Sequence, residues 1–526
     1  MLGHTPRGGA ARPAAPSTTR SLHDRLLRSL AASPDRAVAR WLPDGTALDL
    51  DTFERRVLGA ERCLVRLGSR GGFSGTRVEP DAGTLVLLSG RPTPAWLVAL
   101  TTLWKRGYVP LLADADLSRH EIATLVEQLR PAACLLDRDV DPPGGRRVEL
   151  RADLEGLHAW LPASRRRPAA AVVPPTGAGA VLLTSGTSGR PRGVVLTPDQ
   201  LLADTRQITA ACGVTPDQTL VTALPLSHAY GFGHVLMPLV RQGTRPLFLE
   251  HPLPALLQAG LSERGDLVFP GTPYLYDLLL NSPSRSRCAS VVLFLSAGAP
   301  LPQRLAAAFK KRFRRPIRTF YGTTETGGIA FDGSREGVLP DGCVGRPIAG
   351  VEVTLRPRPH LDDGIGCACV ASAAVALGYL PADARAGLRA GRFETADLAR
   401  FDGDGRLHLT GRADRRINVG GRKVDPGEVE VALRSVPGVR DAVVFGVADA
   451  RRGEAIGARV AGPRGLTRET LLAACRDRLA AWKIPRRIEL CDRLPVDGRG
   501  KIAHAASGGR PARRRHQSAA RSSHTG

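Results

Sequence analysis

Short apolar runs alternate with segments of helical periodicity over most of this chain, and this alternation constrains the fold more than any other feature. Gly and Pro mark the ends of the apolar runs, as in the segment SAGAP at 296–300. The pattern is typical of an α/β protein. The predicted strands are 84–88, 180–184, 194–197, 220–224, 267–270, 291–296 and 318–321. The predicted helices are 22–33, 94–105, 120–129, 201–212 and 302–313.

The character of the sequence changes after Gly411, where a compact and highly charged segment begins. Asp425 followed three positions later by Glu428 predicts a helix start, and this helix runs to about Arg434. The remaining predicted elements of an α+β unit of about ninety residues are a strand pair at 441–447 and 455–460, a helix at 467–481 and a strand at 487–491.

The length of 526 residues exceeds what one hydrophobic core usually serves, so we predict two domains, residues 21–411 and 412–506. The segments 1–20 and 507–526 contain arginine and no acidic residue, and we predict that both are disordered tails.

The formal net charge of +24 raises the question of a nucleic-acid partner. Only six of the 74 basic residues are lysine, a usage typical of the coding bias of a GC-rich genome. No RNP-like aromatic motif, zinc-finger spacing or basic-zipper pattern accompanies the charge, so we expect no nucleic-acid partner. A basic surface still suits polyanionic ligands such as ATP, coenzyme A (CoA) or an acidic carrier protein.

The nine cysteines are scattered, and the pair Cys367 and Cys369 lacks the second pair that a zinc site needs. We interpret them as small buried hydrophobes. The N-terminus has no apolar region of a secretory signal, and no run of eighteen apolar residues predicts a membrane span. A cytoplasmic location is the expectation that follows.

The stretch VLLTSGTSGRPRGVVLT at 181–197 admits three interpretations: a linker, a Walker A loop or another phosphate-binding loop. A Walker A loop needs Lys and a hydroxyl after its last glycine, but Gly189 is followed by Arg-Pro-Arg-Gly. A linker is disfavoured because strand candidates flank the segment closely. Four hydroxyls, glycines and an arginine suit the oxygens of a polyphosphate, although a solvated turn remains the alternative.

Further polar segments follow strand candidates or lie near the domain change. Tyr321-Gly-Thr-Thr-Glu325 comes after a strand, at the sheet edge where α/β proteins bind ligands. Asp397 and Arg412 lie in the segments GRFETADL and GRAD. Each alone is as well explained by a solvated turn or a surface ion pair. Lys501 lies on a glycine-flanked loop, from which a mobile cation could reach a site elsewhere.

The ordered set of these motifs resembles the adenylate-forming superfamily, which contains acyl-CoA synthetases, adenylation domains and luciferases. The order is the Ser/Thr/Gly-rich loop, Pro-Leu-x-His, Gly-Ala-Pro, Tyr-Gly-x-Thr-Glu, Thr-x-Asp, Gly-Arg-x-Asp and a terminal Gly-Lys, over roughly residues 20 to 505. The resemblance implies a large N-terminal α/β domain with several sheets and a small C-terminal α+β domain that rotates on a hinge.

The activity that the resemblance implies is conversion of a carboxylate to an acyl-adenylate with release of pyrophosphate, followed by thioester formation. The implied cofactors are ATP, Mg²⁺ and CoA, or the phosphopantetheine of a carrier protein. The residues that the resemblance assigns to ATP or AMP are Thr184, Ser185, Gly186, Thr187, Ser188, Gly189, Arg192, Gly298, Ala299, Pro300, Tyr321, Gly322, Thr323, Asp397 and Arg412.

The catalytic residues that the resemblance implies are Lys501, Thr324, Glu325 and His228. Lys501 would bridge the attacking carboxylate and the α-phosphate, Thr324 would contact that phosphate and Glu325 would order Mg²⁺. His228 would lie between the acyl pocket and the thiol tunnel, although a lone His is often a core residue.

The hinge of the resemblance corresponds to Asp414, and rotation would bring Val419-Gly-Gly-Arg-Lys423 to the site. Gly420, Gly421 and Lys423 would then line the entry of the pantetheine arm. Tyr230 and Phe232 are candidates for the acyl pocket, and core packing explains them equally well. Lys483 is interpreted as structural or as part of the domain interface.

The chain departs from the pattern of the superfamily at four positions. Arg192 replaces the usual Lys of the loop, and Ser188 replaces a Thr. Ala396 replaces the Gly of Thr-Gly-Asp, which is harmless unless the backbone there needs a positive φ. Pro198 replaces a His.

Members of the superfamily that activate amino acids generally carry an Asp in the Pro-Leu-Ser-His region to hold the ammonium, and residues 224–234 contain no acidic side chain. The resemblance therefore implies an acid without an amino group, and the candidate pocket residues suit a fatty or aromatic acid. The first alternative to a CoA ligase is a free-standing ligase that loads an acyl carrier protein. The second is a non-catalytic nucleotide or nucleic-acid binding protein.

Overall fold

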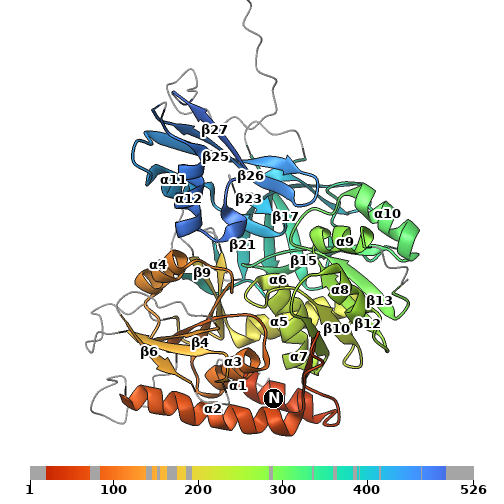
Figure 1. Cartoon of the computed structure of the whole chain (residues 1–526). Helices are drawn as coiled ribbons and strands as arrows, with labels where there is room; N and C mark the ends of the chain where they lie inside the picture. Colours follow the sequence, from red (N-terminus) through yellow and green to blue (C-terminus); the bar gives the residue numbers. More distant parts are fainter. Residues whose placement is uncertain are drawn as a thin grey trace, which may run out of the picture.

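The structure is a computed structural model. It describes residues 19–70, 83–137, 145–150, 154–162, 174–184, 192–282, 288–334, 337–358, 364–382, 388–389, 391–413, 416–463, 465–492 and 494. The fold is a mixed α/β arrangement, with a small C-terminal unit above a larger body (Figure 1).

An eight-stranded sheet forms one half of the body, with strand order β19-β9-β8-β4-β3-β5-β7-β6. Its central strands are parallel and almost fully buried, as expected for a sheet covered by helices on both faces. The strands are β3 (Leu85–Ser89), β4 (Val109–Ala113), β5 (Ala133–Leu136), β6 (Gly145–Glu149), β7 (His158–Pro162), β8 (Ala180–Thr184), β9 (Arg192–Leu196) and β19 (Gly378–Leu380).

A nine-stranded sheet forms the other half, with strand order β16-β15-β14-β13-β12-β10-β11-β1-β2. Its strands are β1 (Ala39–Leu42), β2 (Ala47–Leu48), β10 (Thr219–Thr222), β11 (Arg245–Leu249), β12 (Leu267–Gly271), β13 (Val291–Ser296), β14 (Ile317–Thr323), β15 (Gly327–Phe331) and β16 (Arg346–Pro347).

Helices between the two sheets share the largest hydrophobic cluster with both of them. This cluster joins Val86 and Leu112 of one sheet to Leu220 and Phe248 of the other. Helix α3 (Pro94–Lys105) lies at its centre and is buried from Ala95 to Trp104, and its bounds agree with the predicted helix. The helices around it are α1 (Thr19–Ala31), α2 (Leu50–Arg70), α5 (Pro198–Cys212), α6 (Ala229–Gly231), the π-helix η2 (Phe232–Leu236) and α7 (Met237–Gln242).

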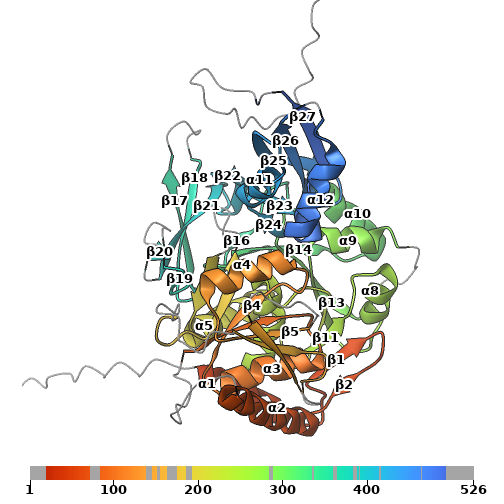
Figure 2. The same ribbon diagram turned by 60° about the vertical axis from the view of Figure 1, so that its left-hand side comes forward.

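Other helices cover the outer faces of the two sheets (Figure 2). They are α4 (Arg119–Leu129) on the eight-stranded sheet, and α8 (Pro254–Leu261), α9 (Pro273–Leu280) and α10 (Gln303–Phe313) on the nine-stranded sheet. A five-stranded antiparallel sheet packs beside β14 and β15. Its strands are β17 (Val351–Pro357), β18 (Gly366–Ser372), β20 (Leu388–Arg389), β21 (Arg392–Phe401) and β22 (Leu407–Arg412).

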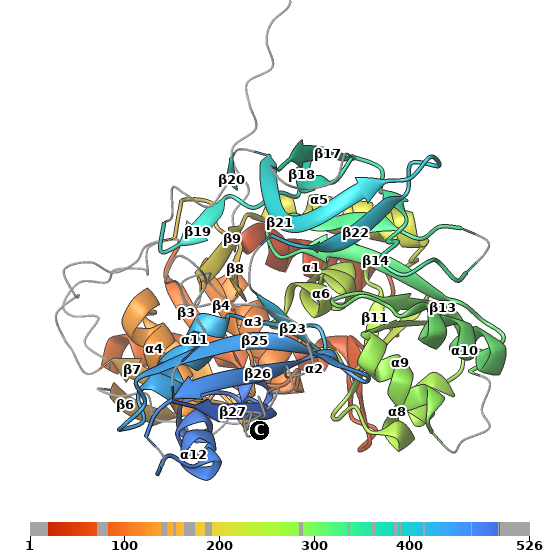
Figure 3. The same cartoon turned by 90° about the horizontal axis from the view of Figure 1, so that it is seen from above.

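The C-terminal unit has a hydrophobic cluster of its own, which runs from Ile417 to Leu479. Its strands are β23 (Ile417–Val419), β24 (Arg422–Val424), β25 (Asp441–Asp449), β26 (Gly453–Ala461) and β27 (Arg487–Cys491), and its helices are α11 (Pro426–Arg434), α12 (Arg468–Arg478) and the 3₁₀ turn η3 (Ala481–Lys483). Seen from above, this unit lies across the junction of the two halves of the body (Figure 3).

The predicted elements agree with the structure except at several ends. Helix α5 begins at Pro198 rather than at 201, because Thr197 accepts the backbone N–H of Gln200 as its N-cap. The predicted helix 467–481 ends at Arg478, where Leu479 turns to an extended backbone before η3. Several elements were not predicted, among them helices α2, α8 and α9, strands β4, β5 and β11, and the five-stranded sheet.

All nine cysteines are free, and five of them are buried. Among the residues that the structure describes, no helix combines the length and apolar character needed to cross a membrane.

Candidate active site

A cavity of about 1280 Å³ lies between the body and the C-terminal unit. Residues from the ends of β4, β8, β13 and β14 line it on one side, and residues of β22, β23, β24 and η3 line it on the other. The carboxyl ends of parallel strands are where α/β sheets bind ligands, so the position agrees with the expected site.

Tyr321, Asp397 and Arg412 come together at this cavity. The Tyr321 hydroxyl donates to Oδ2 of Asp397 at 2.7 Å, and Arg412 forms an ion pair with Oδ1 of the same carboxylate. Asp397 and Arg412 face each other in the β21–β22 register, and Asp397 is only 6% exposed. The pair is therefore a buried contact at the cavity, neither a solvated turn nor a surface ion pair.

The Thr-Ala-Asp variant leaves this geometry undisturbed. Ala396 is not among the residues with positive φ, so the backbone at this position does not need a glycine. Its carbonyl accepts the N–H of Ala413 at 2.7 Å, which holds β21 against the end of β22.

The loop Gly298-Ala299-Pro300 lines the cavity directly after β13. Gly298 has a φ of +84°, a backbone conformation that favours glycine. Its carbonyl accepts Nδ2 of Asn418 at 2.8 Å, so the hairpin of β23 and β24 is docked on this loop.

Gly322, Thr323 and Thr324 also line the cavity, at the end of β14. Glu325 follows them but is buried, and its Oε1 accepts the Tyr379 hydroxyl at 3.1 Å. Burial and the neighbouring Glu325 carboxylate raise the pKa of Tyr379, so this phenol stays protonated.

The two ends of the predicted phosphate-binding loop are paired strand residues. Thr184 of β8 lies opposite Arg192 of β9, and Thr184 lines the cavity. The Arg192 guanidinium carbon lies 5.9 Å from the centroid of the Tyr379 ring. Ser185, Gly186, Thr187, Ser188 and Gly189 lie outside the described residues, as do the predicted catalytic Lys501 and the predicted hinge residue Asp414.

The β23–β24 hairpin brings Lys423 to the cavity. Its turn contains Gly420 and Gly421, with φ values of +61° and +96°. Burial lowers the pKa of Lys423, and the negative charges of Asp397 and Glu325 partly oppose this shift. Lys423 of the C-terminal unit is thus close enough to Asp397 and Glu325 of the body for their charges to act on it.

His228 is held by a carboxylate that the sequence analysis did not identify. Its Nε2 lies 2.6 Å from Oδ2 of Asp114, which directly follows β4. Burial would raise the pKa of Asp114, but His228 and Arg422 outweigh burial and lower it well below the usual range. Nη2 of Arg422 lies 3.8 Å from the same oxygen, so the hairpin also contacts this pair. The available signal was an acidic residue at the end of the apolar run 109–113, a strand that the sequence analysis had not predicted.

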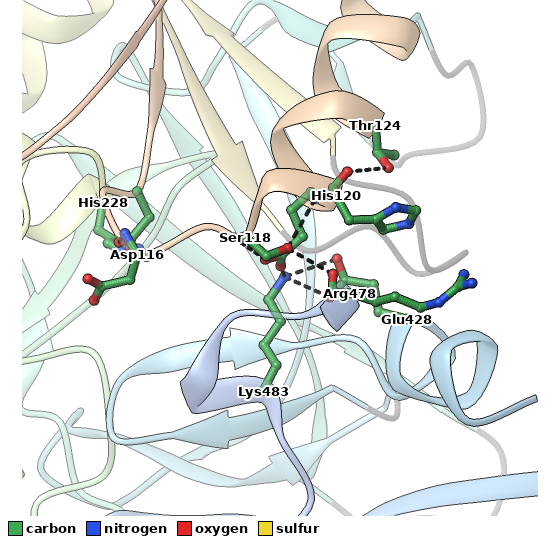
Figure 4. A network of polar contacts seen from close by, with 10 residues as sticks. Asp116, Ser118, His120, Thr124, His228, Glu428, Arg478 and Lys483 are labelled. Carbon is green, nitrogen blue, oxygen red and sulfur yellow. Dashed lines mark hydrogen bonds and ion pairs between the residues drawn. The ribbon is translucent and has the colours of Figure 1, made fainter. Parts of the chain in front are cut away.

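A second contact between the body and the C-terminal unit is centred on Lys483 (Figure 4). Nζ of Lys483 lies 2.5 Å from Oε1 of Glu121 on α4 and 3.0 Å from Oε2 of Glu428 on α11. Burial alone would lower the pKa of Lys483, but the two carboxylates outweigh burial and raise it. Nearby, the Ser118 hydroxyl donates to the Arg478 carbonyl at 2.9 Å. Lys483 is therefore a residue of the interface, which was one of its two interpretations.

The predicted acyl-pocket residues both line the cavity, and both are also packed. The Tyr230 hydroxyl donates to the Leu295 carbonyl at 2.8 Å, and Phe232 is 1% exposed within the main cluster. Two further polar residues line the cavity beside them, Asp204 of α5 and His234 of η2. Neither was identified from the sequence. The Tyr230 ring meets the His234 ring at a centroid distance of 4.8 Å, and a Cβ on Gly233 would lie 3.3 Å from Oδ2 of Asp204. We call the part of the cavity lined by Tyr230, Phe232, Asp204 and His234 the lobe.

Comparison with protein families gives two matches. Residues 78–380 match the AMP-binding enzyme family, and residues 428–501 match the AMP-binding enzyme C-terminal domain. The chain belongs to the AMP-binding enzyme family. Membership confirms the predicted adenylate-forming superfamily and the α/β fold class.

Curated relatives of this AMP-binding enzyme are CoA ligases. It is 35% identical over 337 residues to a feruloyl-CoA synthase from Amycolatopsis sp., which covers 61% of this chain and 67% of that protein. It is 29% identical over 512 residues to a Mycobacterium tuberculosis CoA ligase for a methyl-dioxo-octahydroindenyl propanoic acid, covering 91% of this chain and 98% of that protein.

Among solved structures, the AMP-binding enzyme is similar to a malonyl-CoA ligase in ternary product complex with methylmalonyl-CoA and AMP. The TM-score is 0.69 at 27% identity, over 88% of this chain and 97% of that one. These matches confirm the predicted enzyme class, an AMP-forming carboxylate–CoA ligase.

Proposed function

We propose that this enzyme activates a fatty or aromatic acid without an amino group as its acyl-adenylate, and then transfers the acyl group to CoA. The observation that carries the proposal is that the candidate nucleotide-binding residues and the β23–β24 hairpin line the same cavity. Tyr321, Asp397 and Arg412 come from the body, and the hairpin with Lys423 comes from the C-terminal unit.

In the first half-reaction, a carboxylate oxygen attacks the α-phosphorus and pyrophosphate leaves. Asp397 would accept the ribose hydroxyls, and the Tyr321 ring, held by its bond to Asp397, would face adenine beside Gly298, Ala299 and Pro300. Thr324 would contact the α-phosphate. Thr184 to Arg192 would bind the β- and γ-phosphates, and Lys501 would bridge the carboxylate and the α-phosphate as charge moves to pyrophosphate.

In the second half-reaction, a thiol sulfur attacks the acyl carbonyl and AMP leaves. The docked hairpin supports assigning the observed arrangement to this step, because Gly421 and Asn418 lie against the Gly298 loop. When Nε2 of His228 donates to Asp114, Nδ1 remains as an acceptor for the thiol proton. Rotation of the C-terminal unit about Asp414 would exchange Lys423 for Lys501 at the cavity.

Magnesium fits this site as a companion of ATP. Among the described residues, no three acidic, His or Cys side chains are grouped as a metal site. Glu325 would supply the one carboxylate that Mg²⁺ needs when phosphates supply most of its ligands; in the observed arrangement it is buried behind the cavity wall and accepts the Tyr379 hydroxyl. When bound, the ion would neutralise phosphate charge.

The test is a screen for acid-dependent ATP–pyrophosphate exchange over fatty and aromatic acids, followed by CoA as sole acceptor. Exchange with a member of either class and acyl-CoA formation support the proposal. Exchange without acyl-CoA formation, and with acylation of a carrier protein, would favour the alternative that the basic composition suggests, loading of an acyl carrier protein.

A further inference from the structure

Asp204 places a carboxyl group inside the lobe of the cavity that we assign to the acid substrate. It lies on α5 and lines the cavity together with Ile208 and His234. Oδ1 of Asp204 accepts the N–H of Gly328 at 2.8 Å. Among the residues that the structure describes, no side chain forms a hydrogen bond or ion pair with Oδ2.

The surrounding backbone is shaped to admit this carboxyl group. A Cβ on Gly327, whose φ is +68°, would collide with Oδ1 of Asp204. A Cβ on Gly233 would lie 3.3 Å from Oδ2. Glycines therefore stand at the two positions that approach the carboxylate, one on β15 and one on η2.

The environment of Asp204 disfavours a free negative charge. Burial raises its pKa to about 7, and the N–H of Gly328 only partly opposes the shift. No cationic side chain among the described residues pairs with it, although a buried carboxylate without a partner is costly. A neutral hydrogen-bonding group on a ligand would satisfy Oδ2 in either protonation state, since a hydroxyl both donates and accepts.

His234 supplies a second polar group in the same lobe. Neither ring nitrogen has a hydrogen-bond partner of good geometry among the described residues, although both are buried. Burial lowers the pKa of His234 to about 3, with the Tyr230 carbonyl partly opposing, so the ring is neutral and offers no positive charge to an anion. The rings of Tyr230 and Phe320 meet His234 edge-on, at centroid distances of 4.8 and 4.5 Å. The lobe is thus aromatic with a polar end.

From this geometry we infer that the enzyme selects an aromatic acid with a hydroxyl group on the ring, which bonds to Oδ2 of Asp204 near His234. The inference rests on the proposed function and narrows its substrate class. A purely structural role for Asp204 would explain Oδ1, which accepts the Gly328 N–H. It would not explain why Oδ2 and the two buried ring nitrogens of His234 are polar groups in this lobe. A second carboxylate on the substrate would be repelled from the same position.

The experiment compares matched acids in pyrophosphate exchange: benzoate with 4-hydroxybenzoate, and cinnamate with 4-hydroxycinnamate. We expect kcat/KM to favour the hydroxylated acid of at least one pair by about tenfold or more, because one buried hydrogen bond to a chargeable group is at stake. In Asp204→Leu the preference should vanish. Asp204→Asn keeps an acceptor for Gly328 and should keep the preference.

The dicarboxylic acid terephthalate gives a second measurement, which would not change if Asp204 had only a structural role. Its kcat/KM relative to benzoate should be low in the wild type and rise about tenfold in Asp204→Asn, which removes the charge but keeps the shape. Equal rates for both members of each pair, or a preference that survives Asp204→Leu, would overturn the inference.

Calorimetric binding of the same acids separates this inference from the proposed function. A preference in binding without any exchange would retain the inference and reject the ligase activity of this site. Exchange without any preference for the hydroxylated acids in rate or binding would retain the ligase activity and reject the inference. The absence of both exchange and preference would reject the proposed function and the inference together.

Discussion

Nζ of Lys483 lies 2.5 Å from Oε1 of Glu121, although 362 positions separate the two residues in the chain. One belongs to the C-terminal unit and the other to helix α4 of the body. Their side chains are 7% and 10% exposed, so this ion pair holds the two units together in a nearly dry environment. Lys483 also binds Glu428 within its own unit, so the lysine keeps a partner when the units separate.

Glu121→Gln should therefore affect the two half-reactions unequally. The change removes the charge that attracts Lys483 across the interface and leaves the pair with Glu428 intact. We expect thioester formation to slow by about tenfold while pyrophosphate exchange stays within twofold. A tenfold change corresponds to about 1.4 kcal/mol in the free-energy difference between the observed arrangement and the arrangement that forms the adenylate. Single-turnover formation of adenylate and thioester measures the two steps. Equal slowing of both would argue against a role in the observed arrangement.

Asp397→Asn should weaken ATP binding. The carboxylate accepts from Tyr321 and pairs with the half-buried Arg412, so its loss weakens both contacts as well as removing the proposed ribose contact. We expect KM for ATP in the exchange reaction to rise about 10- to 100-fold. Tyr321→Phe is the matched control, since it keeps the ring and deletes one hydrogen bond, and its effect should be several-fold smaller. A larger effect of the control would show that the hydroxyl, not the carboxylate, dominates.

Asp114→Asn should impair the thiol step through His228. Without the anion 2.6 Å from Nε2, the imidazole loses the partner that fixes its tautomer and its orientation. We expect thioester formation to slow about 10- to 100-fold, while pyrophosphate exchange is unchanged. The double variant with His228→Ala should be less impaired than the sum of the two single effects predicts, because the residues act as one unit. Full additivity of the two changes would contradict this coupling.

Asp204→Asn should alter thermal stability in a pH-dependent way. The folded state holds the Asp204 proton up to about pH 7, whereas the unfolded chain releases it near pH 3.8. The contribution of Asp204 to the free energy of unfolding of the wild type is therefore fully present below about pH 4 and is lost as the pH rises to about 7. The Tm advantage of Asp204→Asn over the wild type should grow between pH 5 and 7 and then level off. Asp199→Asn, exposed on the same helix, is the control. An advantage independent of pH would mean that Asp204 ionises freely in the fold.

The parts of the site that could be predicted from the sequence were those carried by local motifs. Tyr321 follows a strong apolar run, and Asp397 and Arg412 occupy motif segments that the β21–β22 register places opposite each other. Strand and helix positions were predictable for the same reason, because apolar periodicity is local.

Contacts between segments far apart in the sequence could not be predicted from local motifs or apolar periodicity. Glu121 caps α4 through Oε2, which is a contact within one turn of the chain, but its other oxygen binds Lys483 across the interface. Asp204 occupies what reads as a solvated position of an amphipathic helix, and only the packing of β15 and η2 encloses it. The π-helical turn of η2 was also invisible in the sequence, and it places His234 in the lobe while Phe232 packs in the core.

Acid-dependent ATP–pyrophosphate exchange, measured in the wild type and in Lys501→Ala, tests the proposed activity most directly. The proposal predicts exchange with a fatty or aromatic acid and its loss by about 100-fold or more in the variant. Thioester formation from a supplied acyl-adenylate should persist in that variant, because the observed arrangement places Lys423 at the cavity. No exchange with any acid, or exchange unchanged by Lys501→Ala, would contradict it.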